Sequence, residues 1–202
     1  MAKLKIYGIP FSRAFRVLWM AEELGIEYEH IPTDFISDCK QPDYLAINPN
    51  GKIPAIDDDG VIVWESMACN LYLAKKAGGP LAPSNLTEEA HATQWSFWVM
   101  TVIEPKVLEA LLYGTGMMDH PQDASKAKAA IQEIAPAIKV LDDHLAKRSH
   151  LLGETFTVAD LNVAAVFSWA VLGNVDLSAW PNVKGWLEGC LSRPAAQKFL
   201  SP

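Results

Sequence analysis

The segment from Asn48 to Pro54 is the part of this chain whose residue types and spacing best suit chemistry. It reads as a turn followed by a short strand that opens on Pro54. Proline removes a hydrogen-bond donor from a strand, so it is normally confined to an edge or to a special junction. Because an edge strand can bind another extended chain through its backbone, we interpret Ile53-Pro54 as a candidate peptide-binding edge.

Two serines provide further polar groups suited to a ligand. Ser66 follows Glu65 at the head of an apolar helix, where free backbone N–H groups and the positive end of the helix dipole favour a carboxylate. Ser12 stands near the head of an earlier helix. Serine is also a preferred N-cap, so both residues have an alternative, purely structural interpretation as helix caps.

The elements that position these groups alternate between strand and helix patterns over residues 1–78. Asp59-Gly60 is a hairpin signal between the last two strands. The order of elements predicts one parallel crossover and one antiparallel hairpin in a single four-stranded sheet. Apolar periodicity predicts strands at 4–7, 28–31, 55–56 and 61–64, helices at 13–24 and 66–77, and a short irregular helix within 37–46.

The rest of the chain has a helical pattern. Residues 79–86 include two prolines and lack periodicity, which predicts a linker before an all-helical domain at 87–202. Pro105 and Pro136 lie inside the two longest predicted helices, and we expect each to kink its helix. Thr157 to Asp160 is typical of a capping box, with aspartate in place of glutamate. One long helix is predicted to begin at Thr87, and four more are predicted at 123–147, 158–172, 181–191 and 194–200.

Composition excludes several function classes. The 202 residues carry a net charge of −7, which argues against a nucleic-acid or membrane-surface binder. Cys39, Cys69 and Cys190 lack the spacing of a disulfide framework, and five scattered histidines offer no zinc set. We find no signal-peptide pattern after Met1 and no apolar run long enough to span a bilayer. These features predict a cytoplasmic protein without a metal.

Four segments, taken in order, resemble the cytosolic glutathione S-transferase family over essentially the whole chain. The resemblance implies a thioredoxin-like glutathione-binding domain at 1–78 (a βαβ-ββα arrangement) followed by a C-terminal helical bundle. Ser12 lies four residues before Arg16, a spacing similar to that of bacterial-type members with a serine-type active site. The four segments are Ser12-Arg13-Ala14-Phe15-Arg16, Asn48-Pro49 to Pro54, Glu65-Ser66 and Phe156-Thr157-Val158-Ala159-Asp160.

The resemblance also implies how glutathione, the expected cosubstrate, is bound. Pro54 is expected in the cis form, with the Ile53 backbone pairing with the cysteinyl residue of glutathione. Ser66 is expected to contact the γ-glutamyl carboxylate, and Glu65 the α-ammonium group. Lys40 and Lys52 are expected to meet the glycyl carboxylate; alternatively, both are solvated surface groups. The implied glutathione-binding residues are Phe11, Lys40, Lys52, Ile53, Pro54, Glu65 and Ser66.

Ser12 is the implied catalytic residue. Its hydroxyl is expected to donate a hydrogen bond to the glutathione sulfur and so to favour the thiolate. Tyr7 is the alternative, because other classes of the family use a tyrosine near the end of the first strand. The position of Tyr7 in an apolar alternation favours packing instead. No cysteine occupies positions 10–13, which argues against thiol–disulfide exchange as the main activity.

The implied activity is conjugation of glutathione to a hydrophobic electrophile, and the resemblance implies that the enzyme is a homodimer. Isomerisation, dehalogenation or peroxide reduction at the same site is one alternative, and a non-catalytic protein-interaction or ligand-carrier module is another. No nucleic-acid or membrane partner is expected. The acceptor-substrate pocket is expected between the domains, although each lining residue is alternatively part of the core. The lining residues are Ile9, Phe11, Trp98, Tyr113 and Met117.

Overall fold

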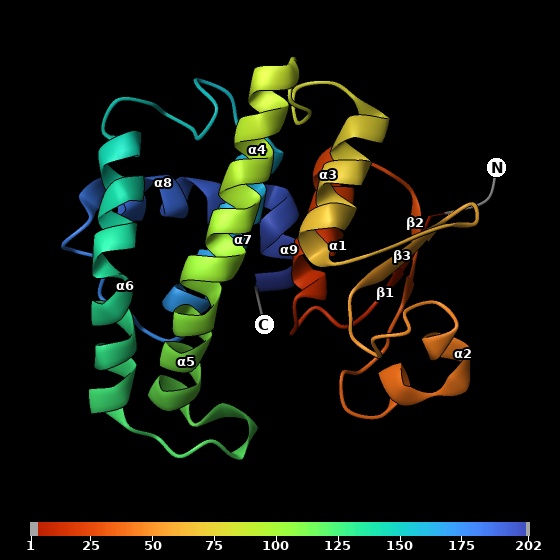
Figure 1. Ribbon diagram of the computed structural model, residues 1–202, viewed down its shortest axis with the longest axis horizontal. Helices are drawn as coiled ribbons and strands as arrows, with labels where there is room; N and C mark the ends of the chain where they lie inside the picture. The colour runs from red at the N-terminus through yellow and green to blue at the C-terminus, as the bar shows by residue number, and fades with distance from the viewer. Residues whose placement is uncertain (1–3, 201–202) are drawn as a thin grey trace. The chain divides into compact units, whose positions relative to one another are not determined.

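A computed structural model describes residues 4–200 of the chain. These residues divide into two compact units (Figure 1). The first is made of residues 4–82 together with 194–200, and the second of residues 83–193.

The first unit contains the single four-stranded sheet that the sequence predicts. Its strands lie in the order β2-β1-β3-β4, with β1 parallel to β2 and antiparallel to β3. β3 and β4 form the predicted antiparallel hairpin, in which Asp59 and Gly60 both have positive φ, as a tight hairpin turn requires. The strands are β1 (Leu4–Tyr7), β2 (Tyr28–Ile31), β3 (Ala55–Asp58) and β4 (Val61–Trp64).

Two helices of the first unit pack side by side next to the sheet (Figure 1). They are α1 (Ala14–Leu24), which ends at Gly25 in the left-handed conformation, and α3 (Ser66–Ala77). Fully buried apolar side chains of the sheet and of these helices form the core of the unit. The segment between β2 and β3 carries a 3₁₀ turn, η1 (Asp38–Lys40), and a single helical turn, α2 (Pro42–Leu45).

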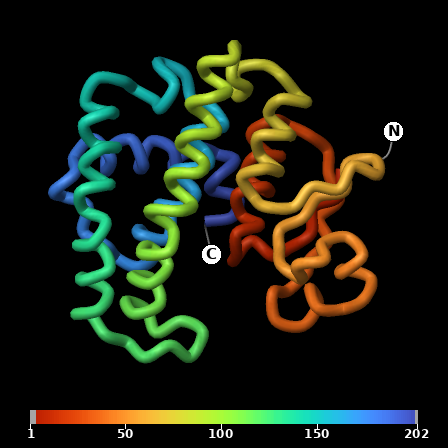
Figure 2. The backbone as a smooth tube through the Cα atoms, viewed as in Figure 1, coloured from red at the N-terminus to blue at the C-terminus, as the bar shows by residue number. Residues whose placement is uncertain are grey.

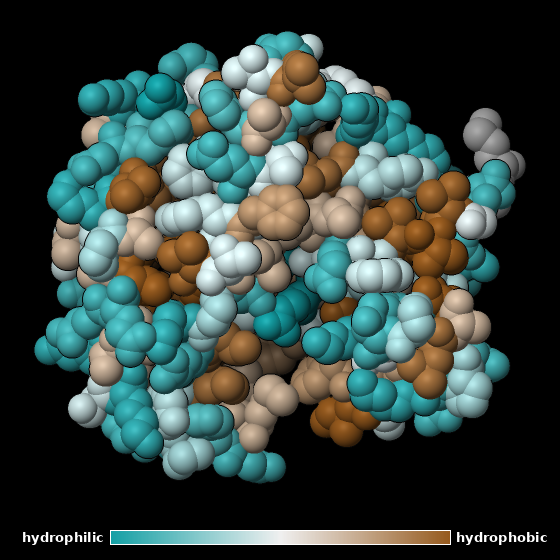
Figure 3. Space-filling model, viewed as in Figure 1, coloured by the Kyte–Doolittle hydropathy of each residue, from teal (hydrophilic) through white to brown (hydrophobic). Residues whose placement is uncertain are grey.

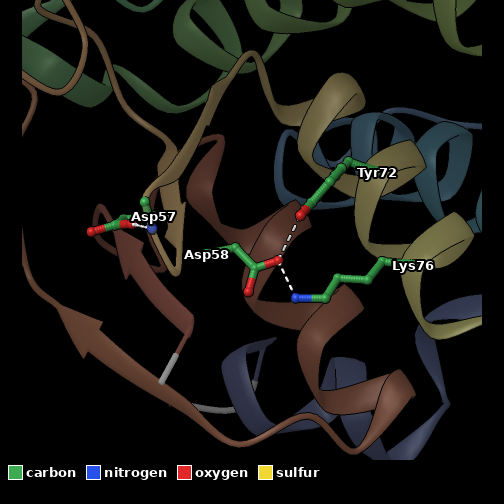
Figure 4. Close-up of polar contacts among 5 residues, drawn as sticks. Asp57, Asp58, Tyr72 and Lys76 are labelled. Atoms are coloured by element: carbon green, nitrogen blue, oxygen red, sulfur yellow. Dashed lines mark hydrogen bonds and ion pairs between the residues drawn. The ribbon is translucent and has the colours of Figure 1, made fainter. Parts of the chain in front are cut away.

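A buried carboxylate ties the end of β3 to α3 (Figure 4). Asp58 is 6% exposed, and its Oδ2 accepts hydrogen bonds from the Tyr72 hydroxyl at 2.7 Å and from the Lys76 ammonium group. Burial disfavours the charge of Asp58, but the two hydrogen bonds together outweigh it, so the pKa of the carboxyl lies below its ordinary value. This contact fixes α3 against the hairpin.

The last helix, α9 (Pro194–Leu200), belongs to the first unit. The Phe199 ring meets the Phe15 ring of α1 edge-on at 6.3 Å, and Lys198 forms an ion pair with Glu22. The structure therefore differs from the predicted boundary, which assigned the whole of 87–202 to the helical domain. The sequence pattern identifies α9 as a helix but does not say which apolar surface it covers.

The second unit is all-helical, as predicted. α7 lies at its centre and is buried at every position from Val158 to Ser168. The neighbouring helices α5 and α6 run side by side (Figure 2). Within residues 4–200, none of the helices is both long and apolar enough to cross a membrane. The helices are α4 (Leu86–Trp98), α5 (Glu104–Thr115), α6 (Ala124–Leu145), α7 (Val158–Leu172) and α8 (Pro181–Leu191).

The two prolines expected inside long helices have different environments. Pro136 lies inside α6, as predicted. Pro105 instead lies in the first turn of α5, because a π-helical segment, η2 (Val99–Ile103), separates α4 from α5. The helical backbone continues from α4 through η2 into α5, so Pro105 lies inside one helical run, as predicted. The distortion takes the form of a π-helical segment directly before the proline, where the Glu104 N–H bonds to the Val99 carbonyl.

The predicted capping box at the start of α7 is confirmed. The backbone N–H of Thr157 donates to Asp160 Oδ2 at 2.9 Å. The other carboxylate oxygen of Asp160 accepts the Leu151 N–H at 2.8 Å and the Trp186 indole N–H at 3.0 Å. Asp160 is fully buried and therefore anchors a loop and α8 to the central helix. Its role is structural.

Candidate binding site at the proline edge of the sheet

The peptide bond between Ile53 and Pro54 is cis, which confirms the expectation for this junction. Both residues are buried, and they immediately precede β3. The paired register of β3 begins at Ala55, opposite Tyr7 of β1 and Trp64 of β4. The Ile53 backbone therefore lies just beyond the paired part of the sheet, where an extended ligand can add to it.

The loop before Ile53 is held by hydrogen bonds to its backbone. The Lys52 carbonyl oxygen accepts the Tyr44 hydroxyl at 2.7 Å and the Asn48 side-chain amide at 2.6 Å. The Gly51 carbonyl accepts a hydrogen bond from the Lys40 ammonium group. Lys40 is thus committed to the loop, whereas the Lys52 side chain is exposed.

Gly51 itself occupies a position that favours glycine. Its φ is +57°, a left-handed conformation that side chains disfavour. A Cβ there would lie 3.0 Å from the Cys39 carbonyl oxygen and 3.1 Å from both Leu45 Cδ2 and Lys40 Nζ. The loop therefore packs closely against η1 and α2, and the absence of a side chain at Gly51 permits that approach.

Glu65 and Ser66 form the N-terminus of α3. Glu65 occupies the N-cap position with φ 74° and ψ 116°, an uncommon conformation for a residue with a side chain, and its carboxylate is exposed. Ser66 is the first residue of the helix and is only 3% exposed. The alternative interpretation of Ser66 as the N-cap is therefore wrong, because Glu65 holds that position.

A buried arginine of α1 contacts Ser66. Arg16 is 1% exposed and donates from Nη1 to Ser66 Oγ at 3.2 Å, while its carbonyl accepts the Asn70 side-chain amide at 3.1 Å. Because the Ser66 oxygen accepts this bond, its own proton can be directed to a ligand. The cationic guanidinium, the helix N-terminus and this hydroxyl together suit a carboxylate.

Ser12 lies between β1 and α1 and is half-buried. Its hydroxyl donates to the Ile9 carbonyl oxygen at 2.6 Å and accepts the Ala14 backbone N–H at 3.0 Å. It therefore satisfies one of the N–H groups at the start of α1, although Arg13, and not Ser12, holds the N-cap position. The same hydroxyl lies at the junction between β1 and α1.

Tyr7, the alternative to Ser12, is packed inside the first unit. Its ring meets the Tyr44 ring edge-on, with centroids 5.9 Å apart, in a cluster that includes Ile53 and Ala55. Burial raises the pKa of the Tyr7 phenol above its ordinary value. These features agree with the packing role that the apolar alternation of β1 favours.

The residues expected to line an acceptor pocket fall into separate places within their units. In the first unit, half-buried Ile9 and 61%-exposed Phe11 flank the Ser12 junction. In the second unit, the Trp98 ring of α4 meets Trp95 edge-on at 5.0 Å. Tyr113 of α5 meets His120 at 4.4 Å, and Met117 begins a 3₁₀ turn, η3 (Met117–Asp119). That these residues form one pocket stays a prediction.

Sequence reasoning missed two contributors to the site, Tyr44 and the guanidinium of Arg16. Arg16 interrupts the apolar face of α1, and a charged residue at a core position was a signal that it has a buried partner. Tyr44 lies in a segment without helical periodicity, and nothing in its surroundings indicates that its hydroxyl reaches Lys52.

The described residues contain neither a disulfide nor a candidate metal cluster. Across residues 4–200, no three histidine, cysteine or acidic side chains are arranged to hold a metal ion. Cys39, Cys69 and Cys190 are buried, and none of the three forms a disulfide. Burial also raises the pKa of the Cys69 thiol far above its ordinary value, so this thiol is a poor nucleophile.

Comparison with known proteins identifies relatives along the whole chain. A family model described as glutathione S-transferase, N-terminal domain, matches residues 2–75, and one described as glutathione S-transferase, C-terminal domain, matches residues 100–194. The chain is 34% identical to glutathione S-transferase 3 of Zea mays, over 100% of this chain and 95% of that protein. It is 30% identical to glutathione S-transferase 1 of the same plant, over 100% and 97%.

Solved structures give the same result. The chain is similar to glutathione S-transferase I bound with lactoylglutathione, with a TM-score of 0.87 and 29% identity over 98% of both chains. It is also similar to a theta class glutathione S-transferase of Xanthomonas axonopodis pv. citri with glutathione bound. For that structure the TM-score is 0.88 and the identity 25%, over 100% of this chain and 99% of the other.

Proposed function

The chain belongs to the glutathione S-transferase family, and from this premise we propose that it conjugates the thiolate of glutathione to electrophilic small molecules. The observation that carries the proposal is the full-length similarity to named transferases, at 34% identity in the first of them. Glutathione is the cosubstrate, and the chemistry needs no metal because the thiolate is itself the nucleophile.

Glutathione binds at the proline edge of the first unit in this proposal. The Ile53 backbone pairs with the cysteinyl residue in the manner of an added strand, beside Pro54. The γ-glutamyl carboxylate accepts the Ser66 hydroxyl proton and the first N–H groups of α3, and the exposed Glu65 carboxylate faces the α-ammonium group. The buried Arg16 contact with Ser66 supports this assignment.

The remaining contacts with glutathione are made by the neighbouring loops. Lys40 and Lys52 provide positive charge for the glycyl carboxylate, and the exposed Phe11 ring covers the ligand. The Lys40 ammonium already binds the Gly51 carbonyl, so it has two further protons to donate. These three assignments rest on position and charge.

Ser12 stabilises the thiolate in this proposal. Its hydroxyl exchanges the Ile9 carbonyl for the glutathione sulfur, while it continues to accept the Ala14 N–H. A hydrogen bond to the charged form lowers a thiol pKa, so a larger fraction of the bound glutathione is nucleophilic at neutral pH. Within the family, the proposed assignment to the bacterial-type members with a serine-type active site rests on Ser12. The relatives named above include both plant proteins and a bacterial one.

The acceptor pocket is proposed to use Ile9 and Phe11, which flank Ser12 in the first unit. Aliphatic and aromatic side chains suit a hydrophobic electrophile. Replacing the exposed Phe11 by serine tests the assignment. We expect the KM for an aryl halide to rise while the KM for glutathione changes less.

Retention on immobilised glutathione and turnover of a model aryl halide test the proposed function. We expect the protein to be retained, eluted by free glutathione and active. A panel of epoxides, isothiocyanates, peroxides and isomerisable substrates then separates conjugation from the alternative glutathione-dependent reactions. Absence of both retention and turnover would indicate a non-catalytic module and overturn the proposal.

We propose that the enzyme is a cytoplasmic homodimer that uses the exposed face of β4. Val61, Ile62 and Trp64 are between 39% and 47% exposed on this edge strand, and Figure 3 shows hydrophobic side chains gathered at the surface over the hairpin. Exposed apolar patches of this kind mark interaction surfaces. Three cysteines that form no disulfide fit a reducing compartment.

The mass in solution tests the dimer. We expect light scattering to give twice the chain mass for the unsubstituted protein and a monomer for Trp64→Arg. Ile36→Arg is the matched control, because Ile36 is 75% exposed in the same unit but lies outside the hairpin. A dimer that survives Trp64→Arg would exclude this face.

A further inference from the structure

We infer that Tyr44 is a positioning residue for glutathione, because its hydroxyl sets the direction of the Ile53 backbone N–H through the Lys52 carbonyl. The inference rests on the proposed function, since it concerns how the proposed docking point is held. Its basis is the pair of hydrogen bonds that Tyr44 and Asn48 donate to one carbonyl oxygen, at 2.7 and 2.6 Å.

The planarity of the peptide bond connects this contact to the ligand. The Lys52 carbonyl and the Ile53 N–H belong to the same peptide unit, which is planar and trans. In such a unit the C=O and the N–H point in opposite directions. Two donors that hold the carbonyl on one side therefore aim the Ile53 N–H to the other side, where the cysteinyl backbone is proposed to bind.

Tyr44 is well placed to act as a fixed donor. It is 6% exposed, and its ring packs edge-on against Tyr7 in the cluster that also contains Cys39, Ile53 and Ala55. Burial raises the pKa of its phenol, so the hydroxyl keeps its proton at any physiological pH. A side chain packed in this way loses little conformational freedom when it makes the hydrogen bond.

Asn48 donates to the same carbonyl but is a poorer residue to substitute. Its Oδ1 also accepts the Asn50 backbone N–H at 3.1 Å and the Asn50 side-chain amide at 3.0 Å. Replacing Asn48 would therefore disturb the turn as well as the carbonyl. Tyr44→Phe removes one donor and keeps the ring that packs against Tyr7.

Tyr28→Phe is the matched control. Tyr28 lies in the same unit, donates its hydroxyl to Glu22 at 2.9 Å, and burial raises its phenol pKa in the same direction. Both substitutions remove one hydroxyl hydrogen bond, and the Tyr28 bond has a charged acceptor, so its loss costs at least as much stability as the loss of the Tyr44 bond. Only the Tyr44 contact lies one residue from Ile53.

Steady-state kinetics of the full chain, with glutathione and an aryl halide, separate the roles. For Tyr44→Phe we expect the KM for glutathione to rise about fivefold, consistent with loss of one hydrogen bond, while kcat and the KM for the halide stay within about twofold. For Tyr28→Phe we expect the KM for glutathione to stay unchanged. An equal KM for glutathione in the two variants overturns the inference.

Amide hydrogen exchange of the unsubstituted protein gives a second readout that needs no variant. The Ile47 and Asn48 amides bond to the Tyr44 carbonyl, at 2.9 and 2.8 Å. If glutathione at Ile53 is coupled to Tyr44, its binding slows exchange at residues 44–48. Binding without this protection overturns the inference alone, whereas failure of the unsubstituted protein to bind glutathione overturns the proposed function with it.

Discussion

The Ser12 hydroxyl donates its proton to the Ile9 carbonyl oxygen, 2.6 Å away, while it accepts the backbone N–H of Ala14. A serine hydroxyl has one proton, so a bond from Ser12 to a ligand sulfur must replace the bond to Ile9. The exchange costs little, because a sulfur anion is a charged acceptor and the carbonyl is neutral. The Ala14 N–H holds the oxygen in place throughout.

Ser12→Ala is expected to raise the pKa of the bound glutathione thiol by about one to two units, since hydrogen bonds to charged groups contribute about 1.5–3 kcal/mol. At neutral pH the turnover should fall about ten- to hundredfold, with a smaller change in the affinity for glutathione. Thiolate absorbance as a function of pH measures the shift. Ser12→Thr keeps the hydroxyl and is the control. An unchanged thiol pKa in Ser12→Ala would contradict the role.

Tyr7→Phe is expected to leave the thiol pKa unchanged and kcat/KM within about twofold, because the ring continues to pack against Tyr44. Burial raises the pKa of the Tyr7 phenol, so its hydroxyl stays protonated at neutral pH, and the prediction rests on the packed position of the ring. The same thiolate titration measures the result. A raised thiol pKa in Tyr7→Phe, with none in Ser12→Ala, would transfer the role to Tyr7.

Local signals explain why much of the fold could be predicted. The stop at Gly25 and the turn at Asp59-Gly60 depend on residues that accept positive φ, and both are readable from sequence. The boundary between α4 and α5 was not predicted, because a π-helical segment keeps apolar residues close to helical spacing. The packing of α9 on α1 was missed because periodicity identifies a helix without identifying its neighbour.

The same distinction applies to the site. The Ile53-Pro54 junction and the helix start at Ser66 are local features, and the sequence predicted both. The bond between Arg16 and Ser66 joins residues fifty positions apart, so no local pattern contains it. The Tyr44 hydroxyl reaches Lys52 only because the intervening loop turns back on α2. Side-chain contacts made by chain reversal need the folded structure.

Gly51→Ala tests the close packing of the loop before the docking edge. Alanine there meets left-handed strain of about 1–2 kcal/mol and also crowds the Cys39 carbonyl at 3.0 Å, so the loop must shift. We expect a lower melting temperature and a KM for glutathione raised at least severalfold. Gly25→Ala is the control, since Gly25 has a similar φ of +62° with nothing within 4 Å of the added Cβ.

The two glycine variants share the backbone strain, so the difference between them isolates the crowding at Gly51. We expect Gly25→Ala to lower the melting temperature without changing the KM for glutathione. An equal KM in both variants would show that the position of the loop does not control glutathione binding.

Asp58→Asn tests the buried contact between the hairpin and α3. The charge of Asp58 accepts hydrogen bonds from Tyr72 and Lys76, so its loss should cost about 2 kcal/mol of unfolding free energy at neutral pH. Asp143→Asn is the control. Asp143 also pairs with a lysine, Lys139, but its side chain is 64% exposed, and its loss should cost less than about 0.5 kcal/mol.

The pH dependence of this difference follows from the direction of the Asp58 pKa shift. Burial acts against the charge, but the hydrogen bonds from Lys76 and Tyr72 outweigh it, so the folded-state pKa lies below the ordinary 3.8. The stabilisation is therefore complete above pH 3.8 and is lost as the pH falls through the lower folded value. Urea unfolding across this range should show that the difference in unfolding free energy between the unsubstituted protein and Asp58→Asn shrinks only in acid. A difference that stays constant down to the lowest pH would mean that the charge of Asp58 does not contribute.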